Sequence, residues 1–367
     1  MKNPAALSRR EFVGQVSLAA AAALVLPRGL RGAAPDRKLG VAVLGLGNYA
    51  THEVAPALEV AKHCRLAAVI TGTPAKGAAW RKRYELPEGN VYSYETMARI
   101  ADNPDIDIVY VVTPPGTHRD FVVAAAKAGK HVISEKPLAP TVAECDEMIA
   151  ACKAAGKRFG VGYRLEFEPH HLEMVRLARD PQFGPFTKMR GGFGFHMGGQ
   201  QWRINKKLAG GGPLPDVGVY VLQASRRAAG AWPVAVTARE LPKTRPDFFT
   251  EVEEAIEWTA EYPGGKICKG WASYNDGRDD FHAESDGGNW VEIDPAYIYG
   301  GLEGRTSRGP MNVPNINQQA AQMDDFAKCV MEGRDTVASG EMGRGDIATI
   351  EAIYASAATG KRVEVKI

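Results

Sequence analysis

The chain has 367 residues, of which 45% are hydrophobic and 24% are charged, a composition typical of an ordinary globular protein. The net charge is +2, but residues 1–34 contain five basic residues and one acid, so the rest of the chain carries −2. No basic excess remains there to favour a nucleic acid as a partner. The length predicts two domains.

The N-terminal segment has the three parts of a signal peptide. Lys2, Arg9 and Arg10 precede an apolar run at residues 16–26, and small residues follow at 32–34. The apolar run has 11 residues and is too short to cross a bilayer as a helix, so no stable membrane anchor is predicted.

The arginine pair of this segment lies in the sequence SRREF at residues 8–12. It resembles the twin-arginine label, which directs folded proteins to a dedicated translocase. A chance pair in an ordinary secretory leader is the alternative. We therefore expect residues 1–34 to be a twin-arginine signal peptide and the mature protein to lie in the periplasm.

The five cysteines are predicted to be reduced packing residues. Cys145 and Cys152 lie seven positions apart in one predicted helix, roughly 10 Å along its axis and too far for a bridge. A chain that folds in the reducing cytosol before export needs no disulfides.

From Leu39 onward, short apolar runs alternate with segments of helical spacing. This alternation predicts a doubly wound parallel sheet with helices on both faces, a Rossmann domain at residues 35–160. The predicted strands are at 39–47, 65–70, 107–113 and 130–134, and the predicted helices at 51–64, 75–84 and 118–129.

A glycine turn follows the first predicted strand and fits the pattern G-x-G-x-x-G/A. Gly45 would form the tight turn, Gly47 would let a pyrophosphate approach the backbone, and Ala50 would let helix and strand pack closely. Asn48 and Tyr49 lie between them. Glycine turns also join strands to helices for purely structural reasons, so that alternative stays open.

The end of the second predicted strand carries no acid that could bind a ribose 2′-hydroxyl, the usual sign of NAD. It offers Thr71, Gly72 and Lys76 instead, which suit a 2′-phosphate. The sequence therefore predicts NADP as the cofactor. The alternative is that Thr71 and Lys76 are ordinary surface residues.

Three residues carry the predicted chemistry. Lys136 follows the strand at 130–134, at the edge of the sheet where ligands bind. Asp216 and Tyr220 follow a glycine loop and lie four apart, so a helix would place them on one face. A tyrosine becomes a usable base when a nearby lysine stabilises its phenolate, and Asp216 could hold a sugar hydroxyl. Taken singly, each residue also has a plain structural explanation.

Six short motifs occur along the chain in the order GLGNYA (45–50), TPPGTH (113–118), EKPL (135–138), GYRLEFEP (162–169), QQWR (200–203) and GGGPLPDVGVY (210–220). These motifs and their order resemble the glucose–fructose oxidoreductase and inositol dehydrogenase (Gfo/Idh/MocA) family. Four features are similar to its glucose–fructose oxidoreductase branch: the leader, ITGTPAK at 70–76, QQWRINKKLAGGG at 200–212, and Tyr220, where many relatives have histidine.

The resemblance implies site residues. Lys136, Asp216 and Tyr220 would form the active site, and Thr71, Lys76 and Tyr94 would contact the 2′-phosphate. Further cofactor contacts would be Gly45, Gly47, Asn48, Tyr49, Ala50, Gly72, Thr113, Pro114, His118, Glu135 and Lys136. The sugar pocket would be lined by Tyr163, Arg164, Trp202 and Arg203 together with Asp216 and Tyr220.

Residues 161–367 are expected to form an α+β domain for substrate binding and dimerisation. Strands are predicted at 232–242, 252–263, 266–275 and 289–295, and helices at 317–334 and 345–360. The family resemblance implies an open, largely antiparallel sheet.

Two polar groups in this part of the chain were considered as sites. Asn315, Asn317, Gln318 and Gln319 either reach the pocket or form a solvated helix start. His170, His171 and His196 lack a completing ligand spacing, so no metal is predicted.

The predicted function is an exported NADP(H)-containing sugar oxidoreductase that oxidises an aldose to its lactone and reduces a second sugar carbonyl on the same bound cofactor. Two alternatives are an NADP-dependent dehydrogenase or reductase of one sugar, polyol or cyclitol with exchangeable cofactor, and a non-catalytic sugar-binding protein. The family's type enzyme has a long arm before its first strand, and this chain lacks it between Ala34 and Leu39. A homodimer is therefore favoured over a tetramer.

Overall fold

The computed structural model describes residues 37–199 and 201–367, and the predicted signal peptide lies outside this part. Residues Lys38–Ile367 form a single unit that contains both sheets. Within the residues described, every helix is too short or too polar to span a bilayer.

The first sheet has six strands in the order β3-β2-β1-β4-β5-β6, and all its pairs are parallel. The chain therefore reverses its direction of travel across the sheet between β3 and β4, and ligands of such sheets bind where the order reverses. The strands are β1 (Leu39–Leu44), β2 (Cys64–Ile70), β3 (Val91–Tyr92), β4 (Ile108–Val111), β5 (His131–Ser134) and β6 (Phe159–Val161).

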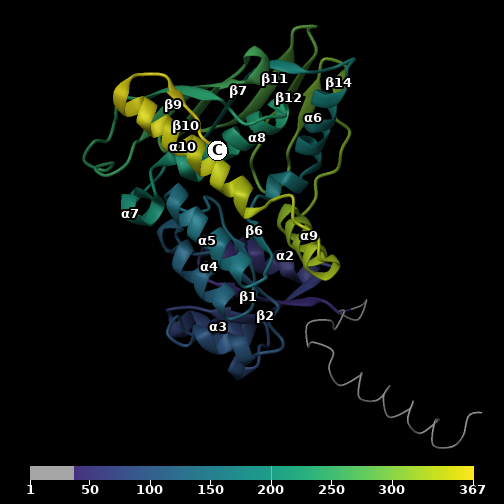
Figure 1. Ribbon diagram of the computed structural model, residues 1–367, viewed down its shortest axis with the longest axis vertical. Helices are drawn as coiled ribbons and strands as arrows, with labels where there is room; N and C mark the ends of the chain where they lie inside the picture. Colours follow the sequence, from purple (N-terminus) through teal and green to yellow (C-terminus); the bar gives the residue numbers. More distant parts are fainter. Residues whose placement is uncertain (1–36, 200) are drawn as a thin grey trace, which may run out of the picture. The chain divides into compact units, whose positions relative to one another are not determined.

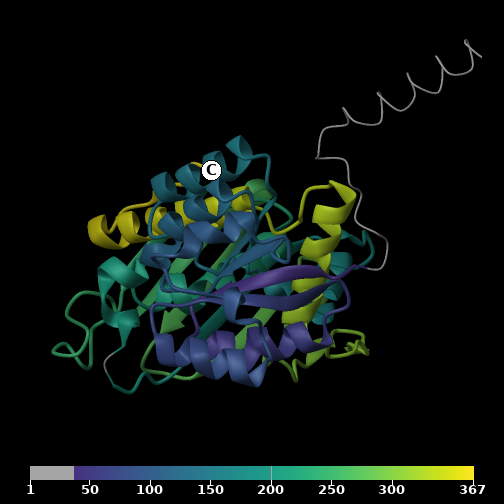
Figure 2. The same cartoon turned by 90° about the horizontal axis from the view of Figure 1, so that it is seen from below.

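Helices cover both faces of this sheet, with α2 and α3 on one face and α4 and α5 on the other (Figure 2). The strand β1 is buried on both sides: Val41 and Val43 pack towards α2, and Ala42 and Leu44 pack towards α4 and α5. A strand buried on both faces has a continuous apolar sequence, which explains LGVAVL. The helices are α2 (Ala55–Val60), α3 (Pro74–Arg83), α4 (His118–Lys127) and α5 (Val142–Ala154).

The second sheet has nine strands in the order β14-β13-β12-β11-β7-β10-β9-β8-β15. Only its β7–β10 pair is parallel, so the predicted α/β fold with an open, largely antiparallel second sheet is confirmed. The strands are β7 (Phe186–Gly194), β8 (Ala235–Glu240), β9 (Ala255–Tyr262), β10 (Lys266–Ser273), β11 (Arg278–Ser285), β12 (Trp290–Ile293), β13 (Gly304–Thr306), β14 (Gly309–Pro310) and β15 (Val363–Glu364).

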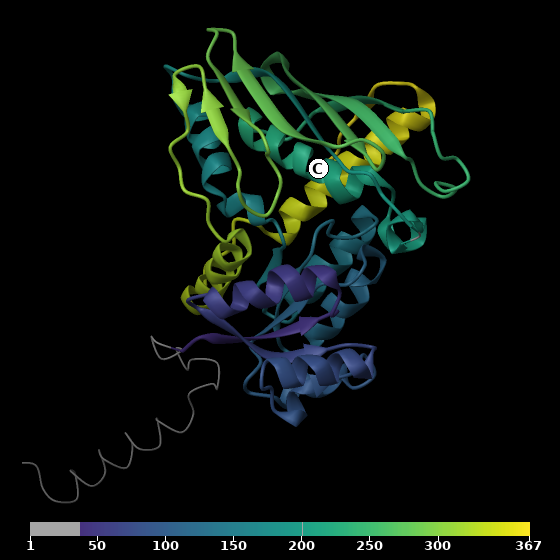
Figure 3. The ribbon, with the colours of Figure 1, turned by 180° about the vertical axis from the view of Figure 1, so that it is seen from behind.

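Two helices pack on one face of the nine-stranded sheet (Figure 3): α8 lies on β7 and β10, and α10 lies on β8. The helices of this part are α6 (Pro169–Arg179), α7 (Lys206–Ala209), α8 (Val219–Ala229) and α10 (Gly340–Thr359). Tighter 3₁₀ turns lie at Glu88–Asn90, Met97–Asp102, Pro115–Thr117, Arg164–Phe167, Trp202–Ile204 and Pro263–Gly265.

Helix α9 (Gln318–Glu332) returns from the second sheet to the first domain and packs beside α2 (Figure 1). Its Met323 and Phe326 join the core that contains Val41 and Val43. Helix α9, from the last third of the chain, therefore contributes to the core of the first domain. The predicted domain boundary at residue 160 does not include this contribution.

The five cysteines are buried and free, as predicted. Burial raises the pKa of the Cys268 thiol to about 12, so this side chain remains a neutral packing group at physiological pH.

Candidate active site

Lys136 follows β5 and reaches from the first domain towards the second. Its Nζ donates to the backbone oxygen of Asp216 at 2.6 Å and to Asp216 Oδ1 at 3.3 Å. Burial would lower the pKa of Lys136, but the nearby groups Tyr220, Asp216 and Glu135 outweigh it and raise the pKa. The side chain is therefore an ammonium ion at neutral pH.

Asp216 lies in a π-helical turn (Leu214–Gly218) that leads directly into α8. Its Oδ2 accepts hydrogen bonds from Arg203 Nε at 2.9 Å and from the Tyr274 hydroxyl at 2.9 Å. Burial would raise the pKa of this carboxyl, but the charges of Lys136 and Arg203, with the hydrogen bond from Tyr274, lower it to about 2. Asp216 is therefore ionised throughout the physiological range.

Tyr220 lies in the first turn of α8 and is only 4% exposed. Lys136 Nζ lies 4.7 Å from its ring centroid, and the Arg164 guanidinium carbon lies 4.8 Å from it. The ring also stacks on Tyr297, with 6.1 Å between centroids. The Lys136 ammonium therefore lies over the Tyr220 ring as a cation–π contact. Lys136 of one motif and Asp216 and Tyr220 of another thus lie in one cluster.

The glycine loop before Asp216 is held by a buried carboxylate. Glu253 accepts hydrogen bonds from the Gly212 and Leu214 backbone N–H groups at 2.9 and 3.1 Å, and from the Tyr354 hydroxyl at 2.8 Å. A Cβ at position 212 would lie 2.3 Å from the Glu253 backbone oxygen, so only glycine fits. This contact positions the turn that carries Asp216.

Glu135 supports the other side of the cluster. Its Oε1 accepts a hydrogen bond from the Tyr110 hydroxyl at 2.6 Å, and its Oε2 accepts one from the Lys136 backbone N–H at 3.1 Å. Gln322 of α9 donates to the same Tyr110 hydroxyl at 2.9 Å. Burial raises the pKa of Glu135. The carboxyl therefore orients the backbone of Lys136.

The turn between β1 and the first helix has the space that a dinucleotide requires. Gly45 has φ +95°, and a Cβ there would lie 2.8 Å from the Thr113 side chain. A Cβ at Gly47 would meet no atom within 4 Å, so its backbone is open to a ligand. Ala50 is fully buried at the start of the helical residues that continue into α2. These residues fit the pyrophosphate of a dinucleotide.

The end of β2 offers the polar groups expected for a 2′-phosphate. The Thr71 hydroxyl accepts a hydrogen bond from the Thr73 backbone N–H at 3.2 Å. The Tyr94 ring lies so close to Gly72 that a Cβ there would be 2.8 Å from it. Lys76 is exposed and forms no ion pair with any other residue in the described ranges. A cation and hydroxyls, without a carboxylate, suit a phosphate rather than a ribose hydroxyl.

Several residues that the resemblance assigns to the site are buried beneath its surface. His118 is buried, with its ring nitrogens 3.0 Å from the Leu138 oxygen and 2.7 Å from the Thr113 oxygen, so it joins two loops of the site. Tyr163 is fully buried. Arg164 binds the backbone oxygens of residues 297 and 298. Arg164 is therefore buried against the Tyr220 ring, and its assignment to the sugar pocket stays a prediction.

The other predicted residues lie nearer the surface. The Thr113 hydroxyl accepts a hydrogen bond from the Thr117 hydroxyl at 2.8 Å, and the Pro114 oxygen accepts one at the same distance. Trp202 and Arg203 form a cation–π pair with 4.5 Å between guanidinium and ring. The Arg203 guanidinium therefore binds Asp216 and also lies over the Trp202 ring.

Sequence reasoning missed Tyr274, Tyr297, Tyr299 and Glu253. Tyr274 lies 58 positions after Asp216, and no local motif links the two. The three tyrosines lie close together in the sequence, at positions 274, 297 and 299, which is a signal that could have found them, and no pattern in the sequence marks Glu253.

A parallel sheet with an open glycine turn, next to a partly buried lysine and aspartate and a buried tyrosine, defines a dinucleotide-dependent oxidoreductase. Residues 39–163 match the family described as "Oxidoreductase family, NAD-binding Rossmann fold", and residues 171–293 match the GFO/IDH/MocA C-terminal domain. The chain belongs to the Gfo/Idh/MocA oxidoreductase family. Its predicted enzyme class is thereby confirmed.

Several similar proteins are known. A crystal structure of aldose-aldose oxidoreductase from Caulobacter crescentus, complexed with glycerol, is 43% identical, has a TM-score of 0.87, and covers 89% of this chain and 100% of its own. A D-xylose 1-dehydrogenase [NADP(+)] from Haloarcula marismortui is 26% identical over 90% of this chain and 94% of its own length. Levoglucosan dehydrogenase, solved with NADH and levoglucosan, is 21% identical with a TM-score of 0.78, which supports the shared fold.

Proposed function

We propose that the protein is an exported sugar oxidoreductase that holds NADP(H). It oxidises an aldose to its lactone and then reduces a second sugar carbonyl on the same bound cofactor. The single observation that carries this proposal is the Lys136–Asp216–Tyr220 cluster. The 43% identity to an aldose-aldose oxidoreductase supports the paired reaction.

NADP is the cofactor that fits the first domain. Two similar enzymes, both D-xylose 1-dehydrogenases, are named for NADP(+), which agrees with the prediction from the end of β2. Gly45 and Gly47 would admit the pyrophosphate, and Thr71, Lys76 and Tyr94 would bind the 2′-phosphate. When bound, NADP supplies the hydride acceptor for oxidation and, once reduced, the hydride donor for reduction.

The side chains of the Lys136–Asp216–Tyr220 cluster accept and return the proton that accompanies hydride transfer. Tyr220 accepts the proton of the aldose hydroxyl during oxidation and returns it to the carbonyl oxygen of the second sugar during reduction. The Lys136 ammonium, 4.7 Å from the ring centroid, stabilises the phenolate between the two steps. Asp216 is ionised and can only accept hydrogen bonds, so it selects a sugar hydroxyl as its partner.

Turnover of sugar pairs without added cofactor tests the proposal. Protein purified from the periplasm and extensively dialysed is mixed with an aldose donor and an aldose or ketose acceptor from a panel. Lactone and polyol should form in equal amounts and without added NADP(+). Turnover that depends on added NADP(+) would instead establish the single-sugar dehydrogenase, an alternative that the D-xylose dehydrogenases favour.

Export by the twin-arginine translocase is part of the proposal, supported by SRREF at residues 8–12. Replacing Arg9 and Arg10 by lysine should retain the full-length protein in the cytosol, as measured by cell fractionation. Continued export of this variant would contradict the assignment. We also propose a homodimer, which light scattering after gel filtration tests; a monomer would overturn it.

A further inference from the structure

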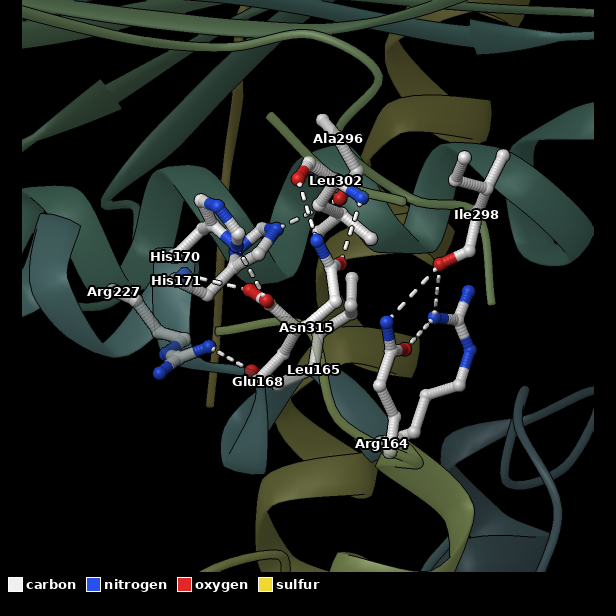
Figure 4. A network of polar contacts seen from close by, with 11 residues as sticks. Arg164, Leu165, Glu168, His170, His171, Arg227, Ala296, Ile298, Leu302 and Asn315 are labelled. Carbon is white, nitrogen blue, oxygen red and sulfur yellow. Dashed lines mark hydrogen bonds and ion pairs between the residues drawn. The ribbon is translucent and has the colours of Figure 1, made fainter. Parts of the chain in front are cut away.

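A loop of the second domain is fixed by buried side chains of other elements. This loop, residues 294–303, joins β12 to β13 and is called the strap below. Figure 4 shows its backbone held from several sides: His171 Nε2 donates to the Ala296 oxygen at 2.9 Å, and Arg164 donates to the Ile298 oxygen at 3.1 Å. Gln318 Nε2 donates to the same Ile298 oxygen at 3.2 Å.

Both ends of the strap are held as well. Asp279 Oδ1 accepts hydrogen bonds from the Ala296 and Tyr297 N–H groups at 2.8 and 2.7 Å. At the other end, Asn315 pairs with both backbone groups of Leu302, at 2.9 and 3.1 Å. Because these bonds come from separate elements, the strap has a fixed conformation.

Four of the polar residues that the sequence left without a role, namely His170, His171, Asn315 and Gln318, belong to this framework. Glu168 accepts hydrogen bonds from His170 Nδ1 at 2.8 Å and from the His171 backbone N–H at 2.9 Å (Figure 4). This fixes the start of α6, from which the His171 ring reaches the strap. The framework costs the burial of several polar groups, and a loop without a function does not need such support.

The strap presents one half-exposed aromatic ring at the dinucleotide turn. Tyr299 is 47% exposed, and its ring centroid lies 5.6 Å from that of Tyr49, which belongs to the turn GLGNYA. The Arg164 guanidinium carbon lies 4.6 Å from the Tyr299 centroid. The same guanidinium carbon lies 4.8 Å from the Tyr220 centroid, so Arg164 contacts both rings. The Tyr299 ring thus packs against the dinucleotide turn and is linked through Arg164 to the Tyr220 ring.

We propose that Tyr299 is a cofactor-retaining residue. Its contact with Tyr49 joins the strap to the dinucleotide turn, and bound NADP(H) leaves when this aromatic contact opens. The inference rests on the proposed function and deepens it, because a cofactor that serves two successive sugars must dissociate slowly. It also assigns to the fixed strap a part in cofactor enclosure.

The dissociation rate of NADPH tests the inference directly. Protein loaded with NADPH is mixed with excess NADP(+), and the loss of nicotinamide fluorescence gives the rate. Tyr299→Ala removes the ring and should release NADPH about tenfold faster, whereas Tyr299→Phe keeps the ring and should retain the wild-type rate. Ile298→Ala is the matched control, since it shortens a neighbouring side chain and keeps the backbone contacts of the strap. Asn315→Ala releases one end of the strap and should accelerate dissociation to a smaller extent.

The possible results separate the two proposals. A wild-type rate for Tyr299→Ala, or equal acceleration by Ile298→Ala, refutes the role of Tyr299 while the proposed function stands. Wild-type protein that shows no change in NADPH fluorescence on loading refutes the proposed function and this inference together. Circular dichroism of each variant establishes that its fold is retained.

Discussion

The charge of Asp216 is predicted to stabilise both the fold and the site. Asp216→Asn keeps the shape of the side chain and an oxygen for Tyr274, but it leaves Lys136 and Arg203 facing each other without a counter-charge. The pKa of the carboxyl is lowered from 3.8 to about 2, because the two cations outweigh the effect of burial. A difference of nearly two pH units corresponds to about 2.5 kcal/mol.

Since the folded pKa lies below the unfolded one, this stability is present above about pH 4 and is lost as the pH falls towards 2. Denaturant unfolding at pH 7 should show Asp216→Asn to be less stable by about 2–4 kcal/mol, which includes the cost of two unpaired cations. Asp335→Asn, the same change in an exposed ion pair with Arg158, is the control and should have little effect. Equal stability of Asp216→Asn and wild type at pH 7 would refute the reasoning.

Three further predictions concern the cofactor and the fold. Thr71→Asp should place a carboxylate where the 2′-phosphate binds, so the ratio of NADP to NAD affinity should fall at least tenfold by fluorescence titration; an unchanged ratio would remove Thr71 from the site. Gly45→Ala should destabilise the fold by about 2 kcal/mol or more because of its φ of +95° and its contact with Thr113, whereas Gly47→Ala should remain stable but bind NADP weakly. Burial and nearby cations lower the pKa of His131 from 6.5 to about 4. Between these pH values the unfolded state binds more protons than the folded state. The free energy of unfolding therefore falls as the pH drops from 6.5 to 4. His131→Asn can still accept from the Arg158 N–H and should lose up to about 3 kcal/mol of this pH dependence in unfolding curves; an unaltered pH profile would contradict it.

Much of the first domain was predictable because its strands are buried on both faces. Segments such as LGVAVL have no polar residues, and the glycine turn follows directly. The central strands β7 and β11 of the second sheet escaped prediction for the opposite reason. FTKMRGGFG contains three glycines and two basic residues, and RDDFHAES is mostly polar, so neither has a clear strand pattern.

The site was predictable only where a motif marks it. Lys136, Asp216 and Tyr220 stand in short motifs with characteristic neighbours, and the fold brings them together. Tyr274 reaches the same cluster, and Glu253 reaches the glycine loop before it, from distant parts of the chain, and no periodicity predicts contacts between residues so far apart. The same limit applied to Gln318 of α9, whose contact with the strap follows from tertiary packing alone.

The proton-transfer role of Tyr220 is the central claim, and single-turnover kinetics of Tyr220→Phe test it most directly. Protein carrying NADP is mixed rapidly with an aldose, and the absorbance of reduced nicotinamide is followed as a function of aldose concentration. The variant should reduce its cofactor about 10²–10⁴-fold more slowly, while the aldose concentration giving half-maximal rate changes little. A variant that transfers hydride at the wild-type rate would contradict the claim.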